Sequence, residues 1–156
     1  MTFNVVVDTR EKQSWNFDNS DLVEKTISQK LDTGDYAVEG LEHILCIERK
    51  QSVSEIAQNI SQARFQDVLK RMKLFEHKFL LLEFDIDKIL QFPVGSNVPK
   101  KIWGKLKVRG PYILRSLARI QVKYGVQVVF CGDSDNAKYV ALNLMREVYE
   151  ERNEDQ

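Results

Sequence analysis

Cysteine, histidine and long apolar runs are scarce in this chain. Both of its cysteines, Cys46 and Cys131, lie in apolar stretches without a partner motif, and we interpret them as reduced core thiols. The two histidines, His43 and His77, lack the companions that a zinc site needs. No apolar run approaches membrane-spanning length, and the N-terminus does not resemble a signal peptide. We therefore expect a cytoplasmic protein without a membrane partner.

Acidic residues are missing from one long segment. Lys and Arg number 23, as do Asp and Glu, so the formal net charge is zero. Residues 88–132 nevertheless contain nine Lys or Arg and no Asp or Glu, whereas residues 147–156 carry five acids and one Arg. A basic face directed at a polyanion is one interpretation of this asymmetry. Burial of part of the segment in a helix and a strand is the other.

Alternating strands and helices predict one α/β domain with a mixed central β-sheet flanked by helices. Apolar residues make up 43% of the chain, and there is no repeat, linker or low-complexity segment. We expect residues 1–149 to form this domain and 150–156 to be a frayed acidic tail. The expected strands are 3–8, a hairpin within 34–50 that turns near 39–42, 78–84 and 126–131. The expected helices are 20–30, 52–74 with a bend near 61–63, 110–124 and one beginning near 133.

Three charged residues of the predicted hairpin carry the chemistry. Glu48 and Lys50 are two residues apart on a strand, so they share a face and Arg49 points to the other. With a two-residue loop, Asp35 lies opposite Cys46 or Glu48, and either register places it on the face of Glu48 and Lys50. Hard carboxylate oxygens suit Mg²⁺ or Mn²⁺. This arrangement fits metal-assisted phosphodiester hydrolysis, although the pattern alone is weak.

Four short motifs, taken in order, are more specific. They are Val6-Val7-Asp8-Thr9-Arg10-Glu11, Gly34-Asp35-Tyr36, Ile47-Glu48-Arg49-Lys50 and Arg64-Phe65. This series resembles the nuclease domain of the XPF/Mus/Hef structure-specific endonucleases, which have a restriction-endonuclease-like fold.

The resemblance implies a role for each matching position. Asp35, Glu48 and the carbonyl of Ile47 would bind the metal, with Asp8 as a further ligand or a supporting residue, and Lys50 would be the catalytic lysine. Asp8, Arg10, Glu11 and Arg49 would support the active site.

One position departs from the family pattern. The family has an Asp that would fall at Ser54, and the nearest acid here is Glu55. Either Glu55 replaces that Asp through a shifted helix start, or the acidic role is absent. A capping box formed by Ser52 and Glu55 is the competing interpretation of Glu55.

The expected function is metal-dependent DNA cleavage at branched or single-strand-containing DNA. Because this chain shows none of the helix-hairpin-helix segments that the family usually appends, DNA contacts are expected within the domain or from a partner. The candidates are Arg64, Lys100, Lys101, Trp103, Lys105, Lys107 and Arg109, and then Arg115, Arg119 and Lys123. The resemblance also implies a homodimer formed through the last two helices. A non-catalytic DNA-binding or scaffold subunit is the alternative, and an RNA-processing or anti-defence interaction protein is a third class.

Overall fold

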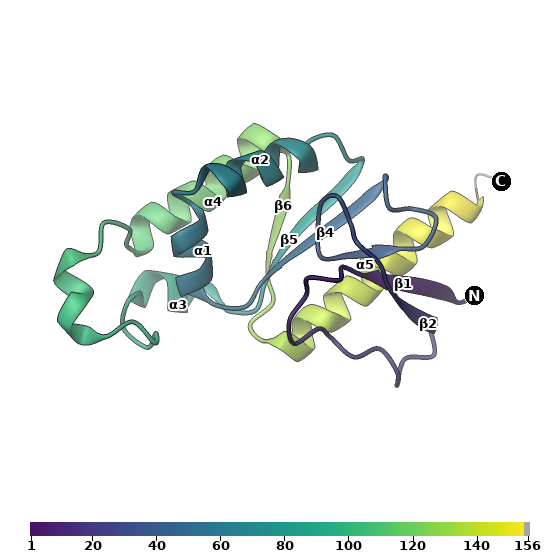
Figure 1. Cartoon of the computed structure of the whole chain (residues 1–156), viewed down its shortest axis with the longest axis horizontal. Coiled ribbons are helices and arrows are strands. Elements are labelled where there is room, and N and C mark those ends of the chain that lie inside the picture. The colour runs from purple at the N-terminus through teal and green to yellow at the C-terminus, as the bar shows by residue number, and fades with distance from the viewer. Residues whose placement is uncertain (155–156) are drawn as a thin grey trace.

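A six-stranded mixed sheet forms the centre of the protein (Figure 1). The computed structural model describes residues 1–154. The strand order is β2-β1-β3-β4-β5-β6; β3 runs antiparallel to β1 and β4, and the remaining pairs are parallel. The strands are β1 (Phe3–Val7), β2 (Val23–Ser28), β3 (Tyr36–Val38), β4 (Leu45–Lys50), β5 (His77–Leu82) and β6 (Gln127–Phe130). The helices are α1 (Val53–Asn59), α2 (Ala63–Met72), α3 (Ile86–Gln91), the 3₁₀ helix η1 (Lys100–Lys105), α4 (Gly110–Tyr124) and α5 (Ser134–Glu154).

Helices cover both faces of the sheet. Side chains of a strand alternate between faces, and in β5 Leu80 and Leu82 join the core under α1, α2 and α4, whereas Phe79 and Leu81 join the core under α5. All four are buried. Burial on both faces explains why β5 is a continuous apolar run instead of an alternating one. The predicted α/β fold with a mixed sheet flanked by helices is therefore confirmed.

The predicted hairpin is present with a longer connection. Residues 39–44 link β3 to β4, so the connection is longer than the two residues assumed in deriving the register. Tyr36 pairs with Ile47, and continuing this antiparallel register places Asp35 opposite Glu48. This is one of the two predicted registers. The expected bend near 61–63 is also present, because α1 ends at Asn59 and α2 begins at Ala63.

Two expectations about local structure are wrong. The segment expected to be a helix from Ser20 or Asp21 to Lys30 is the edge strand β2, which pairs in parallel with β1. Its apolar Val23 and Ile27 suit one side of a half-exposed strand as well as one face of a helix, and the open edge of β1 provides the pairing. At the other end α5 continues to Glu154, so residues 150–154 are helical; residues 155–156 lie outside the described part.

Figure 1 shows that η1 and its flanking loops form a lobe at one end of the molecule, beyond α1 and α3. We call residues 98–109 the basic lobe. No helix within residues 1–154 is long and apolar enough to cross a membrane.

The contact between α3 and α4 gives a stability prediction. A Cβ added to Gly110 would meet the backbone carbonyl oxygen of Ile89, whereas one added to Gly104 would meet nothing within 4 Å. Glycine to alanine in a helix normally stabilises by up to about 1 kcal/mol. Gly110→Ala should instead destabilise by about 1–3 kcal/mol because backbone has to move. Urea unfolding measures both, and a Gly110→Ala protein as stable as Gly104→Ala would contradict the close helix contact.

Candidate active site

A cavity of about 350 Å³ lies between strands β1 and β4 and the helix α2. Asp35 and Glu48 are on its wall, together with three arginines. Its lining is Asp8, Arg10, Asp32, Thr33, Gly34, Asp35, Glu48, Arg64, Asp67, Val68 and Arg71. The structure thus brings together the two predicted carboxylates, Asp8, Arg10 and Arg64.

Backbone hydrogen bonds fix the position of Asp35. Its amide donates to the carbonyl oxygen of Ile47 at 2.8 Å, and its carboxylate accepts the Arg49 amide at 2.8 Å. These two hydrogen bonds to β4 therefore hold Asp35 opposite Glu48. The Ile47 carbonyl, expected as a metal ligand, already accepts this one hydrogen bond and keeps a second lone pair.

The two carboxylates destabilise each other. Burial raises the pKa of Asp35 well above its ordinary value, and the negative charge of Glu48 raises it further. Burial also raises the pKa of Glu48, although Lys50 opposes that shift. Two recessed carboxylates with raised pKa values are the donor set that a hard divalent cation neutralises. The residues present therefore fit a Mg²⁺ or Mn²⁺ site at Asp35 and Glu48.

Lys50 lies beside Glu48 and is buried. Its Nζ is 3.5 Å from a carboxylate oxygen of Glu48 and 3.6 Å from one of Glu55, and it lies over the ring of Phe65. The amide of Glu55 donates to the Ser52 hydroxyl at 3.2 Å, which is the helix-capping contact of α1. Ser52 thus caps the helix while the Glu55 carboxylate reaches Lys50. The expected capping contact and an acidic neighbour for the lysine coexist.

The Asp8 carboxylate binds Arg10 and the backbone that follows β2. Its carboxylate accepts the Arg10 Nε–H at 2.9 Å and the Leu31 amide at 2.8 Å. Burial opposes ionisation of Asp8, but these hydrogen bonds outweigh burial and lower its pKa. Because each of the two oxygens already accepts two protein donors, the geometry favours a supporting role for Asp8 over direct metal ligation. The Arg10 side chain is 61% exposed and borders the cavity.

Arg49 points to the opposite face of β4, as the strand alternation predicts. Its guanidinium lies 2.8 Å from the carboxylates of both Glu11 and Glu83, and it also donates to the Tyr36 hydroxyl at 3.1 Å. Trp15 packs against the guanidinium and donates its indole N–H to Glu83 at 2.7 Å. Arg49 and Glu11 therefore belong to a buried network behind the carboxylates, outside the cavity.

Several of these residues were missed in the sequence. Trp15, Tyr36 and Glu83 complete the network around Arg49, and a charge directly after the apolar run of β5 was the signal for Glu83. Asp67 and Arg71 line the cavity with Arg64. Their positions 64, 67 and 71 follow the spacing of one helix face, which was the available signal. Arg71 also donates to the Thr33 hydroxyl at 2.9 Å, close to Asp35 in sequence.

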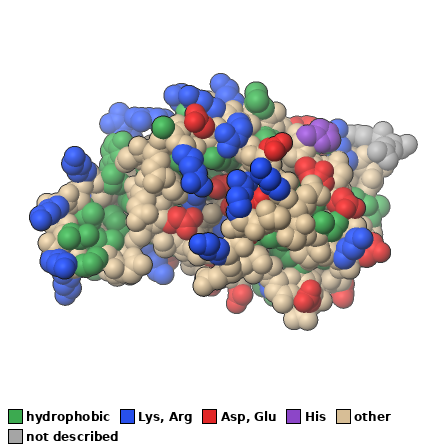
Figure 2. Space-filling model, in the orientation of Figure 1, with side chains coloured by type: hydrophobic (Ala, Val, Ile, Leu, Met, Phe, Trp, Pro, Cys, Tyr) green, Lys and Arg blue, Asp and Glu red, His purple; other side chains and the backbone are tan. Residues whose placement is uncertain are grey.

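The remaining DNA-binding candidates lie outside the cavity. Lys100, Lys101, Lys105, Lys107 and Arg109 are exposed residues of the basic lobe. Trp103 is half-buried, and its indole donates to the carbonyl of Val98 at 2.9 Å. Arg115, Arg119 and Lys123 are exposed on α4. Figure 2 shows Lys and Arg side chains at the lobe end and along the middle of the same face.

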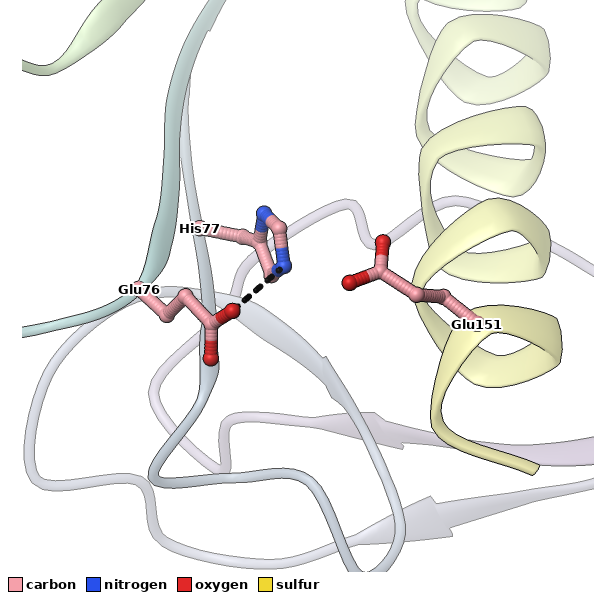
Figure 3. Close-up of side chains that lie close together, drawn as sticks. All are labelled: Glu76, His77 and Glu151. Atoms are coloured by element: carbon pink, nitrogen blue, oxygen red, sulfur yellow. Dashed lines mark ion pairs between the residues drawn. The ribbon is translucent and has the colours of Figure 1, made fainter. Parts of the chain in front are cut away.

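A second group of potential metal ligands lies elsewhere. Glu76, His77 and Glu151 are the one such group of three found within residues 1–154, with ligand atoms within 4.8 Å of one another. Figure 3 shows His77 at the start of β5 turned toward both glutamates. Glu76 is half-exposed and already pairs with Arg152 and with His77. An ion-pair cluster accounts for these contacts, and it shares no residue with the cavity.

The Arg49 network gives a prediction. Arg49→Met removes a buried cation and leaves Glu83 and Glu11 without it, so unfolding free energy should fall by about 3–5 kcal/mol. Arg146→Met breaks only the exposed pair with Glu150 and should cost less than about 1 kcal/mol. Urea unfolding compares the two. An Arg49→Met protein of normal stability that has lost only catalysis would instead place Arg49 against the substrate.

Comparison with known proteins agrees with this architecture. A family model for the ERCC4 domain matches residues 7–142. The structure of XPF from Aeropyrum pernix superposes with a TM-score of 0.68 at 23% identity, covering 94% of this chain and 65% of that one. Its complex with DNA gives a TM-score of 0.59 at 18% identity, covering 96% and 66%. The chain thus spans about two thirds of the XPF chains, and no curated protein matches it.

The family match includes the motifs that place Asp8, Asp35, Glu48 and Lys50 around one sheet end. The solved structures share the fold over nearly all of this chain. The resemblance inferred from the sequence is confirmed, and the chain belongs to the ERCC4 domain family.

Proposed function

We propose that this protein is a DNA endonuclease that uses Mg²⁺ or Mn²⁺ to hydrolyse phosphodiester bonds in branched or single-strand-containing DNA. The observation that carries the proposal is the meeting of Asp35 and Glu48 at one arginine-bordered cavity, with the Lys50 ammonium 3.5 Å from the Glu48 carboxylate. Family membership supports nuclease chemistry, and a related protein, XPF from Aeropyrum pernix, has been solved in complex with DNA. We assign this cleavage to DNA repair, recombination or replication, in the cytoplasm, nucleoid or nucleus, whichever compartment contains the DNA.

Each residue has a distinct task in this proposal. Asp35 and Glu48, with the carbonyl of Ile47, hold a divalent cation, which when bound polarises a phosphate and lowers the pKa of a bound water. Lys50 offers ammonium hydrogens to the attacked phosphate or to the attacking water, where negative charge develops. Asp8 holds Arg10 at the mouth of the cavity, and Arg10 and Arg64 contact the neighbouring phosphates.

DNA contacts outside the cavity are assigned to the basic lobe. Its exposed cations carry no compensating acid within residues 88–132, so they neutralise phosphates along the substrate. A homodimer through α4 and α5 is also part of the proposal. Its support is exposed apolar surface on both helices, since Val122 on α4 is 88% exposed and Tyr139 on α5 is 60% exposed.

Cleavage of a labelled DNA panel tests the catalytic proposal. The panel holds duplex, single strand, flap, splayed arm, fork and four-way junction, each with Mg²⁺, Mn²⁺ or EDTA. Asp35→Asn and Lys50→Met should each reduce the cleavage rate about 100-fold or more, because they remove a metal ligand and the charge that stabilises the phosphate. Lys70→Met is the matched control, because Lys70 is an exposed cation on α2. Binding of these DNAs without cleavage by the wild type would favour a non-catalytic subunit.

The charge of the carboxylate pair predicts a cost in stability. An acid whose pKa is raised by folding binds its proton more tightly in the folded state, so the metal-free protein loses stability as pH rises above the ordinary value of 3.8. Asp35→Asn removes this cost. In EDTA its melting temperature should exceed that of the wild type near pH 7, and the difference should shrink as pH falls toward about 4.

Divalent cations should stabilise the wild type more than Asp35→Asn and so oppose the difference in melting temperature expected in EDTA. Mg²⁺ or Mn²⁺ should raise the melting temperature of the wild type more than that of Asp35→Asn, because only the wild type keeps both carboxylate ligands. Thermal melts with and without metal measure both effects. Equal metal-dependent shifts in the two proteins would remove Asp35 from the metal site.

A further inference from the structure

A second cavity lies apart from the candidate active site, between α1 and the basic lobe. It has a volume of about 230 Å³, and we call it the lobe groove. Its lining is Ser54, Ala57, Gln58, Phe92, Val98, Ile102, Leu106, Lys107 and Val108. Most of these side chains are aliphatic, and Ile102 is 36% exposed. An apolar groove open at the surface of a protein commonly marks a binding site.

Hydrogen bonds brace the wall of the groove. The Trp103 indole donates to the carbonyl of Val98 at 2.9 Å, and its own carbonyl accepts the Arg109 guanidinium at 2.7 Å. The Leu106 amide also donates to the Trp103 carbonyl at 3.2 Å. These contacts tie Val98 and Leu106, which flank η1, to Trp103. The indole supports the groove from within the lobe.

The border of the groove is cationic. Lys107 lines it, and the exposed Lys100, Lys101 and Lys105 belong to the same lobe. No Asp or Glu occurs between residues 88 and 132 to offset them. The complementary occupant is therefore an anion that also presents apolar surface. An unpaired stretch of DNA has both properties, because its phosphates are charged and each base has an apolar face.

Helix α1 connects the groove to the candidate active site. Ser54 lines the lobe groove, and the adjacent Glu55 lies 3.6 Å from the Nζ of Lys50. Both residues belong to the first turn of α1, which begins three residues after Lys50. A strand that leaves the catalytic residues along this helix reaches the groove within a short distance.

We propose that the lobe groove holds the bases of an unpaired segment of the DNA substrate and so selects single-strand-containing DNA over duplex. This inference rests on the proposed function, since it assumes that DNA is the substrate. A base in a duplex is stacked and paired, so it cannot present its face to the groove. The lysines of the lobe contact phosphates in either kind of DNA, and the groove favours unpaired DNA over duplex.

Ile102→Lys separates apolar contact from charge. The variant removes an apolar wall and adds a cation, so a purely electrostatic surface would bind all DNA more tightly. A base-binding groove predicts instead that Ile102→Lys binds a fluorescein-labelled oligothymidylate of ten nucleotides about tenfold more weakly than the wild type does. Binding of a blunt duplex of the same length should be unchanged or tighter. Leu74→Lys adds the same charge at a site 84% exposed just after α2, away from both cavities and from the proposed dimer helices, and is the matched control.

Fluorescence anisotropy in EDTA measures binding without cleavage, and circular dichroism confirms that the variant is folded. Tighter or unchanged single-strand binding by Ile102→Lys would overturn the inference and leave the groove to another occupant, such as an acidic protein segment. In that case cleavage by the wild type can still stand. A wild type that neither binds nor cuts any DNA would overturn the proposed function together with the inference.

Discussion

The constraint on which the site depends is the placement of two like charges opposite each other, one directly before β3 and one on β4. Asp35 lies opposite Glu48, and the ladder hydrogen bonds to Ile47 and Arg49 prevent them from moving apart. Burial raises the pKa of both carboxyls, and the charge of Glu48 raises the pKa of Asp35 further. A fold retains such a pair at a cost in stability, and the cost is offset when a cation binds. The proposed cation site therefore accounts for a carboxylate pair that stability alone would not retain.

The alternation of β4 divides the remaining work between two faces. Glu48 lines the cavity and Lys50 lies beside it on the same face of β4, whereas Arg49 faces the core under α5, where Glu11 and Glu83 neutralise its charge. Arg49 thus has two structural roles. Its amide holds Asp35, and its side chain anchors β4 against the loop after β1. A buried cation with two carboxylates tolerates little displacement. The strand that carries the catalytic candidates is consequently held in place from behind.

The sequence predicted those parts of the structure that depend on strong local periodicity or on adjacent residues. The alternation at Glu48, Arg49 and Lys50 follows from strand geometry alone, and the phase change near 61–63 located the gap between α1 and α2. Strand β2 could not be distinguished from a helix, because a polar edge strand owes its structure to its neighbour. Glu83, Trp15 and Tyr36 come together from three distant segments, so no local pattern contains their network.

Helix α1 shows how two interpretations that compete in a sequence can both hold in a structure. Capping needs only the backbone amide of Glu55, which bonds to Ser52, and the carboxylate remains free to reach Lys50. A glutamate one residue later than the family's aspartate has an additional methylene group and starts from a position rotated by about 100° around the helix. Its carboxylate lies 3.6 Å from the Lys50 ammonium, which is the proximity that a replacement for that aspartate would require. Ser54, in the same turn, lines the lobe groove, so the first turn of α1 contributes to both the surroundings of Lys50 and the groove.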